Sequence, residues 1–443
     1  MNTPVVDFVK RYIESDTVRL HMPGHKGKSF LGCESWDITE VKGADALFEA
    51  EGILAQSEEN ATNLFGSRRT CYSTEGSSHC IRAMLYLAVT NRPAGASPTV
   101  VAARNVHGAS VPRAALLDLD VEWLWPEESR SLCGCPVTPE SLDRMLSALP
   151  SPPAAVYLTS PDYLGGMAEL SSLAEVCHRH RTLLAVDNAH GSYLRFLEPS
   201  LHPLDLGADL CCDSAHKTLP VLTGGAYLHI SKSAPHGLEE HVKTALALFG
   251  STSPSYLTLC SLDLCNRYLA EGYPARLQGA ISQLKLLKVK LKNLGWQVEE
   301  SDPLRVTLKA PQGTTGQELA ERLRLGGVEC EYADRDFLVL MATPENTPEE
   351  LEQALTALGR NQAPPTNTPF LPLAKGKRVC SIRQALFSPH QLIPSREALG
   401  RTCAAPTVGC PPAVPIAVAG EEIGPEALEL FQYYNVSTVD VLK

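Results

Sequence analysis

An aspartate and a lysine stand 30 residues apart in this chain, each after a short apolar run. Asp187 follows residues 183–186 (LLAV), and Lys217 lies in the segment 214–220 (SAHKTLP) after the run 208–212. A lysine amine can form a Schiff base with an aldehyde, and a carboxylate facing a pyridine nitrogen keeps that ring protonated and electron-accepting. The pair is typical of a pyridoxal phosphate (PLP) site, in which Ser214 and His216 would hold the phosphate.

A short motif of this kind also arises by chance, and a lysine after a strand is often only a solvated loop residue. The flanking elements favour the chemical interpretation. Both apolar runs lack polar alternation, which is expected of parallel strands covered on both faces. Ligands of open α/β sheets bind at the carboxyl ends of such strands. We therefore expect Asp187 and Lys217 at one ligand-binding edge.

A glycine turn, residues 74–78 (TEGSS), precedes an expected helix over 78–90. Hydroxyls and free backbone N–H groups at a helix start, with the positive end of the helix dipole, suit a phosphate. A plain serine N-cap is the alternative. Together with the lysine segment, the turn predicts Gly76, Ser77 and Ser78 as phosphate ligands.

Two further strands bring polar residues to the same edge. His107 follows the strand 100–103, where its imidazole would stack on the pyridine ring or serve as a buried structural histidine. Ser160 and Tyr163 follow the strand 155–159, where either would bond the cofactor, unless the segment is an ordinary proline turn.

Composition excludes several classes of protein. The 443 residues carry a formal net charge of -11, which gives no support for binding nucleic acid or an anionic membrane. No window resembles a membrane span, and the charged start lacks the apolar core of a signal peptide, so we expect a cytoplasmic protein. The 14 cysteines are scattered, several of them in apolar elements, which predicts neither a metal site nor a disulfide framework.

The length predicts more than one domain. Alternating strands and helices up to residue 230 predict an α/β fold, a large domain with a mainly parallel sheet and crossover helices. A long helix over 273–294 leads to a small α+β domain, expected to hold strands at 305–309, 328–332 and 337–341 and helices at 317–325 and 348–358. The expected divisions are an N-terminal segment (1–54), the large PLP-binding domain (55–300), the small domain (301–360), a linker (361–372) and a C-terminal domain (373–443).

The order of these motifs resembles the Orn/Lys/Arg decarboxylases, PLP enzymes of fold type I, which share the aspartate aminotransferase fold. The resemblance covers most of the chain. It rests on residues 21–27 (HMPGHKG), 37–40 (DITE), 43–47 (GADAL), 76–78 (GSS), 104–107 (RNVH), 187–191 (DNAHG) and 214–220 (SAHKTLP). The chain resembles the short form of the family, without the N-terminal wing domain.

The resemblance implies a Schiff base between PLP and Lys217, a stacking His107, and Asp187 at the pyridine nitrogen with Ala189 and His190 beside it. It implies loss of carbon dioxide from a basic amino acid, with Lys217, His107 or His216 returning the proton. Two positions depart from the family pattern: Asn188, where an acid is common, and Leu164, where an aromatic residue is common. These departures put the choice of substrate in doubt.

By the same resemblance, Glu421 is the expected partner of the substrate's distal cation, with Asp45 second and a solvated loop acid as the alternative for Glu421. A homodimer at least is expected, with the turn 223–225 near the partner's phosphate. Lysine, arginine and ornithine stay open as substrates. Another fold type I enzyme, an aminotransferase or a lyase, is the nearest rival, since Arg383, Arg396 and Arg401 could bind an α-carboxylate. A non-catalytic PLP-binding protein is a further alternative.

Overall fold

The computed structural model describes residues 1–443 apart from 93, 109, 128–130, 367–369 and 407–413. The chain divides into two compact units, the first made of residues 1–97, 149–158 and 170–276, and the second of residues 98–148, 159–169 and 277–443. Seven strands belong to one mostly parallel sheet. In the first unit their order is β1-β7-β6-β5-β4, and in the second β2 lies beside β3.

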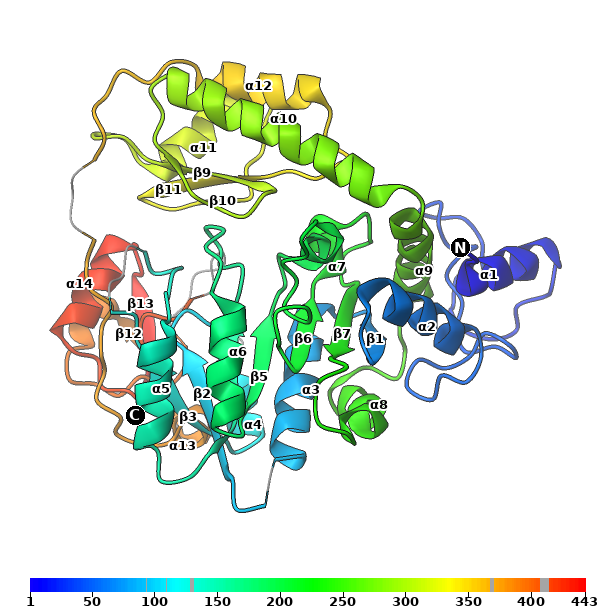
Figure 1. Ribbon diagram of the computed structural model, residues 1–443, viewed down its shortest axis with the longest axis horizontal. Helices are drawn as coiled ribbons and strands as arrows, with labels where there is room; N and C mark the ends of the chain where they lie inside the picture. The colour runs from blue at the N-terminus through cyan, green and yellow to red at the C-terminus, as the bar shows by residue number, and fades with distance from the viewer. Residues whose placement is uncertain (93, 109, 128–130, 367–369, 407–413) are drawn as a thin grey trace. The chain divides into compact units, whose positions relative to one another are not determined.

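The first unit carries the segments of Asp187 and Lys217, in β5 and α7 (Figure 1). Its strands are β1 (Arg69–Ser73), β4 (Pro153–Thr159, whose last residue falls in the second unit), β5 (Leu183–Asp187), β6 (Leu210–Asp213) and β7 (Ala226–Ile230). Its helices are α1 (Pro4–Glu14), α2 (Ile53–Phe65), α3 (Gly76–Thr90), α6 (Leu170–Arg179), η1 (Ser192–Phe196), α7 (Ala215–Thr218), α8 (Leu238–Phe249) and α9 (Tyr256–Ala270).

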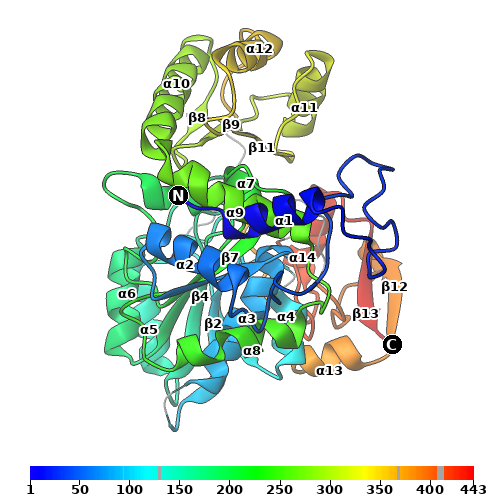
Figure 2. The same cartoon turned by 90° about the vertical axis from the view of Figure 1, so that its right-hand side faces the viewer.

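Burial on both faces explains why β5, β6 and β7 read as continuous apolar runs, because every residue of the three strands is buried. Helix α3 packs against all three strands. Strands β5 and β6 are parallel, with Val186 opposite Cys211, whereas β7 runs antiparallel to both β6 and β1. Helices α1, α2 and α9 pack on one another, and α2 also packs on β1 (Figure 2).

The second unit holds three strand groups. The pair β2 (Ser97–Ala103) and β3 (Asp120–Leu124) is parallel. A four-stranded antiparallel sheet has the order β10-β11-β9-β8, and β12 pairs with β13. The strands are β8 (Val298–Glu299), β9 (Arg305–Lys309), β10 (Tyr332–Ala333), β11 (Phe337–Met341), β12 (His390–Pro394) and β13 (Thr438–Leu442). The helices are α4 (Ser110–Leu116), α5 (Pro139–Ala148), α10 (Tyr273–Asn293, which begins in the first unit), α11 (Gly316–Leu325), α12 (Pro348–Leu358), α13 (Ile382–Phe387), η2 (Ser395–Glu397) and α14 (Pro425–Tyr433).

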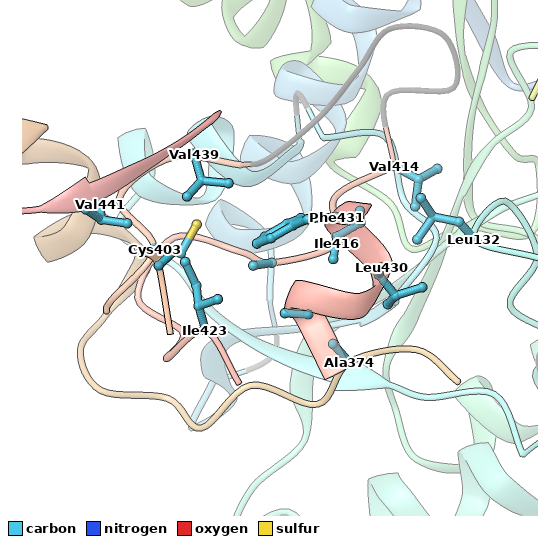
Figure 3. Packing of buried hydrophobic residues seen from close by; sticks show 13 residues of the cluster. Leu132, Ala374, Cys403, Val414, Ile416, Ile423, Leu430, Phe431, Val439 and Val441 are labelled. Carbon is cyan, nitrogen blue, oxygen red and sulfur yellow. The ribbon is translucent and has the colours of Figure 1, made fainter. Parts of the chain in front are cut away.

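The C-terminal segment has a hydrophobic cluster of its own (Figure 3). The side chain of Phe431, from α14, points toward that of Val439, from β13, and Leu430 and Val441 belong to the same cluster. Ala427 of α14 and residues from preceding segments complete the cluster: Leu132, Ala374, Ala398, Cys403, Val414, Ile416, Ala417 and Ile423. Burial of a full Leu or Phe side chain contributes about 1.5–3 kcal/mol, so this cluster can hold the segment in place.

The strands expected over 100–103, 155–159, 183–186 and 208–212 are present as β2, β4, β5 and β6, and the helix expected over 78–90 is present as α3. One expectation for the small domain was wrong. The strand predicted over 328–332 is reduced to Tyr332 and Ala333, because the Val328 N–H bonds the Leu323 carbonyl at the end of α11 instead of joining a ladder. The described part of the predicted linker, 361–366 and 370–372, contains no helix or strand. No helix in the described ranges is long and apolar enough to cross a bilayer.

Candidate active site

The parallel pairing of β5 and β6 brings the two principal segments to one sheet edge. Asp187 is the last residue of β5 and pairs with Cys212 of β6. Directly beyond, the Asn188 N–H bonds the Cys212 carbonyl at 2.9 Å. Lys217 follows in α7, a single helical turn that begins two residues after β6 ends. The sequence expectation that Asp187 and Lys217 flank adjacent strand ends therefore agrees with the structure.

The carboxylate of Asp187 is only 3% exposed and is held from three directions. Oδ2 accepts a hydrogen bond from the Tyr157 hydroxyl at 3.3 Å. Oδ1 accepts from the Ala189 N–H at 3.1 Å and lies 3.7 Å from the Cys212 thiol. These donors fix the carboxylate in one orientation. Tyr157 was not singled out from the sequence, since a tyrosine inside an apolar strand looks like an ordinary core residue.

The Lys217 amine lies 2.7 Å from Nε2 of His190. An ammonium group only donates, so Nε2 of a neutral His190 is the acceptor when Lys217 is charged. His190 is itself buried, which keeps competing water away from this contact. The sequence assigned His190 only to cofactor binding, whereas the geometry also makes it a place for the proton of Lys217.

The loop before α3 forms a small polar cradle. The hydroxyls of Ser77 and Ser214 lie 2.8 Å apart, which joins the helix start to the lysine turn. Gly76 has a φ of +73°, and a Cβ at this position would meet nothing within 4 Å. Open space therefore lies in front of the first turn of α3, whose N–H groups have no partner within the helix. A phosphate group fits such a cradle.

The turn 223–225 links the same two segments within one chain. The Gly76 N–H bonds the carbonyl of Gly224 at 2.7 Å, and the His216 N–H bonds that of Gly225 at 3.2 Å. Gly224 has a φ of +95°, and a Cβ there would lie 2.5 Å from the Thr74 carbonyl, so this position requires glycine. The expectation that this turn also lies near a partner subunit's phosphate stays a prediction.

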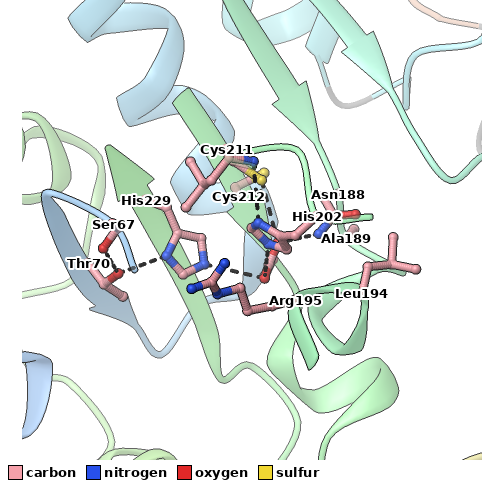
Figure 4. Close-up of polar contacts among 12 residues, drawn as sticks. Ser67, Thr70, Asn188, Ala189, Leu194, Arg195, His202, Cys211, Cys212 and His229 are labelled. Carbon is pink, nitrogen blue, oxygen red and sulfur yellow. Dashed lines mark hydrogen bonds and ion pairs between the residues drawn. The ribbon is translucent and has the colours of Figure 1, made fainter. Parts of the chain in front are cut away.

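A buried polar network lies directly behind the strand ends (Figure 4). Oδ2 of Asp213 accepts from Nε2 of His202 at 3.1 Å and from Nε2 of His229 at 3.3 Å, while Oδ1 accepts from Nδ2 of Asn188 at 2.7 Å. Burial alone would raise the pKa of Asp213, but the two histidines more than offset it and hold the pKa well below its usual range.

His202, Cys211 and Asp213 stand close enough to hold a metal ion, with their ligand atoms within 4.8 Å of one another. The Cys211 thiol, however, already donates to Oδ1 of Asp213 at 3.6 Å. Hydrogen bonds already account for the carboxylate. We interpret the cluster as a hydrogen-bonded network. None of its members was predicted as a site residue, because its contacts join residues 11 to 25 positions apart.

His107 and Ser160 belong to the second unit. His107 follows β2, and its carbonyl accepts the Ser110 N–H at 2.7 Å. Ser160 follows β4 and is 1% exposed, and its Oγ accepts the Ala168 N–H at 3.1 Å, which stabilises its own loop. Both positions after strand ends are as expected, while their roles toward a cofactor stay predictions.

Glu421 is buried in the second unit beside Arg104. Its Oε2 lies 3.5 Å from Nη2 of Arg104 and accepts the Val418 N–H at 2.9 Å. Burial raises the pKa of Glu421, opposed by the neighbouring guanidinium. The expected alternative of a solvated loop acid was therefore wrong for Glu421, since the carboxylate is enclosed and paired within the unit.

Asp45, in the first unit, has a structural task. Its two carboxylate oxygens accept the backbone N–H groups of Ala46, Glu51, Gly52 and Leu54 at 2.8–3.1 Å. Burial opposes ionisation, but these four donors lower the pKa of Asp45. The side chain thus organises the chain entering α2.

Comparison with known proteins agrees with this geometry. A family model described as "Orn/Lys/Arg decarboxylase, major domain" matches residues 3–310. The chain is 28% identical to an arginine decarboxylase of Bacillus subtilis, over 96% of this chain and 92% of the relative. It is 26% identical to an arginine decarboxylase of Halalkalibacterium halodurans, over 95% and 91% of the two chains.

Solved structures share the fold. The constitutive lysine decarboxylase of E. coli superimposes with a TM-score of 0.79 at 17% identity, covering 100% of this chain and 82% of the other. A serine palmitoyltransferase solved with PLP gives a TM-score of 0.55 at 17% identity, covering 69% and 75%. The architecture is that of PLP enzymes of fold type I. Since the family match extends over most of the chain and the strand ends carry the motifs expected of it, the protein belongs to the Orn/Lys/Arg decarboxylase family and is an amino-acid decarboxylase.

Proposed function

We propose that the protein removes the carboxyl group of a basic amino acid, arginine, lysine or ornithine, with PLP held through Lys217. The observation that carries the proposal is the meeting of Asp187, Lys217 and the Ser77–Ser214 cradle at the ends of β5 and β6. The relatives named as arginine decarboxylases and the solved lysine decarboxylases support a basic substrate.

The residues of the first unit fit PLP. Lys217 supplies the amine for its aldehyde, the open cradle at Gly76, Ser77 and Ser78 suits its phosphate, and the fixed carboxylate of Asp187 suits its pyridinium N–H. When bound, PLP supplies an acceptor for the electron pair released with carbon dioxide. His107 is the proposed stacking residue.

The protein's own groups would manage protons and charge. His190, 2.7 Å from the Lys217 amine, can accept the ammonium proton and so free the amine as a nucleophile. The same pair can hold the proton that is returned to the α-carbon. Nδ1 of His216 lies 3.0 Å from the Gly225 carbonyl, so it carries the hydrogen and leaves Nε2 as the basic nitrogen. Tyr157 and the Ala189 N–H keep Asp187 oriented throughout.

Glu421 is the proposed acid for the substrate's distal cation. Among the described residues, Arg104 and the Val418 N–H contact Oε2, and we propose Oε1 as the partner of an ammonium or guanidinium. A homodimer and a cytoplasmic location remain predictions.

The proposal is tested by carbon dioxide release from a panel of basic amino acids. Wild type should release carbon dioxide with equimolar amine, and borohydride should abolish the absorbance of bound PLP. Lys217→Ala should lose both the PLP absorbance and turnover, whereas Lys290→Ala, which changes an exposed lysine paired with Glu352, should keep both. A keto acid in place of carbon dioxide would identify an aminotransferase. Unchanged turnover in Lys217→Ala would refute the lysine assignment.

A further inference from the structure

Asp213 lies between the candidate site and the interior of the first unit. It is the last residue of β6, four positions before Lys217, and its side chain is 0% exposed. A buried carboxylate that lacked hydrogen bonds would cost several kcal/mol, so its partners are a structural requirement. Those partners come from three other segments: Asn188 after β5, His202 after η1, and His229 in β7.

The hydrogen-bond pattern is satisfied with both imidazoles neutral. Each Nε2–H donates to Oδ2 of Asp213, and Nδ1 of His229 accepts from the Thr70 hydroxyl at 2.8 Å. Nδ1 of His202 lies 3.4 Å from the Leu204 N–H. Burial lowers the pKa of His229, which keeps that ring neutral. The negative charge of Asp213 thus faces donors from two histidines, the Asn188 amide and the Cys211 thiol.

The Asn188–Asp213 contact is one of a series that joins the two strand ends. Asp187 pairs with Cys212 through the backbone, Asn188 bonds Asp213 through side chains at 2.7 Å, and His190 then meets Lys217 at 2.7 Å. The side-chain contact therefore stands between the strand ladder and the reacting lysine. This contact bridges the ends of β5 and β6, and the distance between these ends must stay constant if Lys217 is to stay aligned with Asp187.

We propose that Asp213 and Asn188 are positioning residues, whose buried hydrogen bond sets the separation of the β5 and β6 ends and thereby aims Lys217. This inference rests on the proposed function of Lys217. The hydrogen bonds from the two histidines fix the position of the Asp213 side chain. The hydrogen bond from Asn188 then holds the segment that carries Asp187 and His190 at a fixed distance from Asp213. Misplacement of a reacting group by about 1 Å can cost a hundredfold in rate, so a buried contact of this kind matters without touching substrate.

Asn188→Ala is the first test, because it removes the contact while leaving Asp213 its two histidine partners, so the protein should fold. Ser192→Ala is the matched control. Ser192 belongs to the same segment and is equally buried, but its hydroxyl has no hydrogen-bond partner among the described residues. We expect kcat to fall about tenfold or more in Asn188→Ala, with KM within about twofold, and neither to change in Ser192→Ala.

The second test exchanges the two side chains. Asn188→Asp alone places two carboxylates together, whereas Asn188→Asp with Asp213→Asn restores a donor and an acceptor, with the amide oxygen toward the histidines. The double variant should regain most of the kcat that Asn188→Asp loses. A merely structural role would alter thermal unfolding and leave kcat unchanged.

A third readout needs no turnover: the rate at which borohydride fixes added PLP onto Lys217. We expect this rate to fall in Asn188→Ala and to recover in the double variant. Wild-type rates in Asn188→Ala, or a double variant no better than Asn188→Asp, would overturn the positioning role. If wild type traps PLP but releases no carbon dioxide, the proposed decarboxylation is refuted instead. The trapping rates of the variants would still test the positioning role of Asp213.

Discussion

Arg104 is the buried cation that ties the C-terminal segment to the end of β2, and Arg104→Met is a sharp perturbation of it. The guanidinium is 2% exposed. It donates to the carbonyls of Pro415 and Ile416 at 2.8 and 3.0 Å and pairs with Glu421 at 3.5 Å. Methionine fills much of the same volume but leaves the Glu421 carboxylate buried without its cation.

The expected magnitudes follow from these contacts. Removing one member of a buried ion pair costs about 3–5 kcal/mol, so Arg104→Met should lower the free energy of unfolding by that amount. Glu421→Gln should cost only about 1–2 kcal/mol, because Arg104 keeps its two carbonyl partners. In the double variant Arg104→Met with Glu421→Gln, residue 421 is neutral, so the loss of Arg104 leaves no buried charge without its partner. The double variant should therefore be about 2 kcal/mol more stable than the sum of the two single losses predicts.

Urea unfolding followed by tryptophan fluorescence suits this measurement, because Arg104 lies 5.3 and 5.2 Å from the rings of Trp123 and Trp125. Acid should relieve the Arg104→Met defect. Burial raises the folded-state pKa of Glu421 and the Arg104 guanidinium opposes that rise, so loss of Arg104 should raise the pKa further and protonation at low pH should favour the folded variant. Strictly additive losses, or a defect that does not depend on pH, would refute the argument that Arg104 offsets the buried charge of Glu421.

Three other changes probe separate parts of the chain. Burial raises the pKa of Asp263 from 3.8 to about 6. The free energy of unfolding should therefore fall by on the order of 3 kcal/mol as the pH rises between those values. In thermal unfolding measured against pH, Asp263→Asn should make this fall smaller. Ser77→Ala should weaken PLP binding to the apoprotein about tenfold, as measured by fluorescence titration, through loss of a phosphate hydrogen bond of about 1.5 kcal/mol; equal affinity would contradict the cradle. Glu421→Gln should raise KM for the basic substrate more than it lowers kcat, whereas Asp45→Asn should lower stability and leave KM unchanged; an unaltered KM in Glu421→Gln would assign Glu421 to Arg104 alone.

The strands at the centre of the site could be predicted because burial on both faces leaves a local mark in the sequence. Strands β5, β6 and β7 are each a short run of buried, mostly apolar residues. Two strands of the same sheet were missed, β1 (RTCYS) and β3 (DVEWL). Strand β1 is mostly buried but mixes polar and apolar residues, and β3 is mostly half-exposed, so neither gives such a run. Pairing with β7 and β2 makes them strands.

The same distinction separates the site residues that were predicted from those that were not. Asp187 and Lys217 are recognisable because strand ends converge in a parallel sheet, a rule that needs no knowledge of distant contacts. Asp213 also ends a strand, yet its role depends on His202 and His229, which meet it only through tertiary folding. In the sequence, an aspartate after two cysteines does not indicate that two distant histidines will bond it.

Glu421 shows why the substrate is harder to predict than the chemistry. Its partner Arg104 is 317 positions away, and the pair is buried with an ion-pair distance of 3.5 Å. Neutralising a buried carboxylate internally and presenting it to a substrate cation are competing uses of the same charge. If Glu421 serves both, each of its oxygens must have a different partner, and a variant that releases Oε2 from Arg104 should bind the basic substrate more tightly while the protein becomes less stable. Affinity and stability would then change in opposite directions, which a purely structural ion pair does not require.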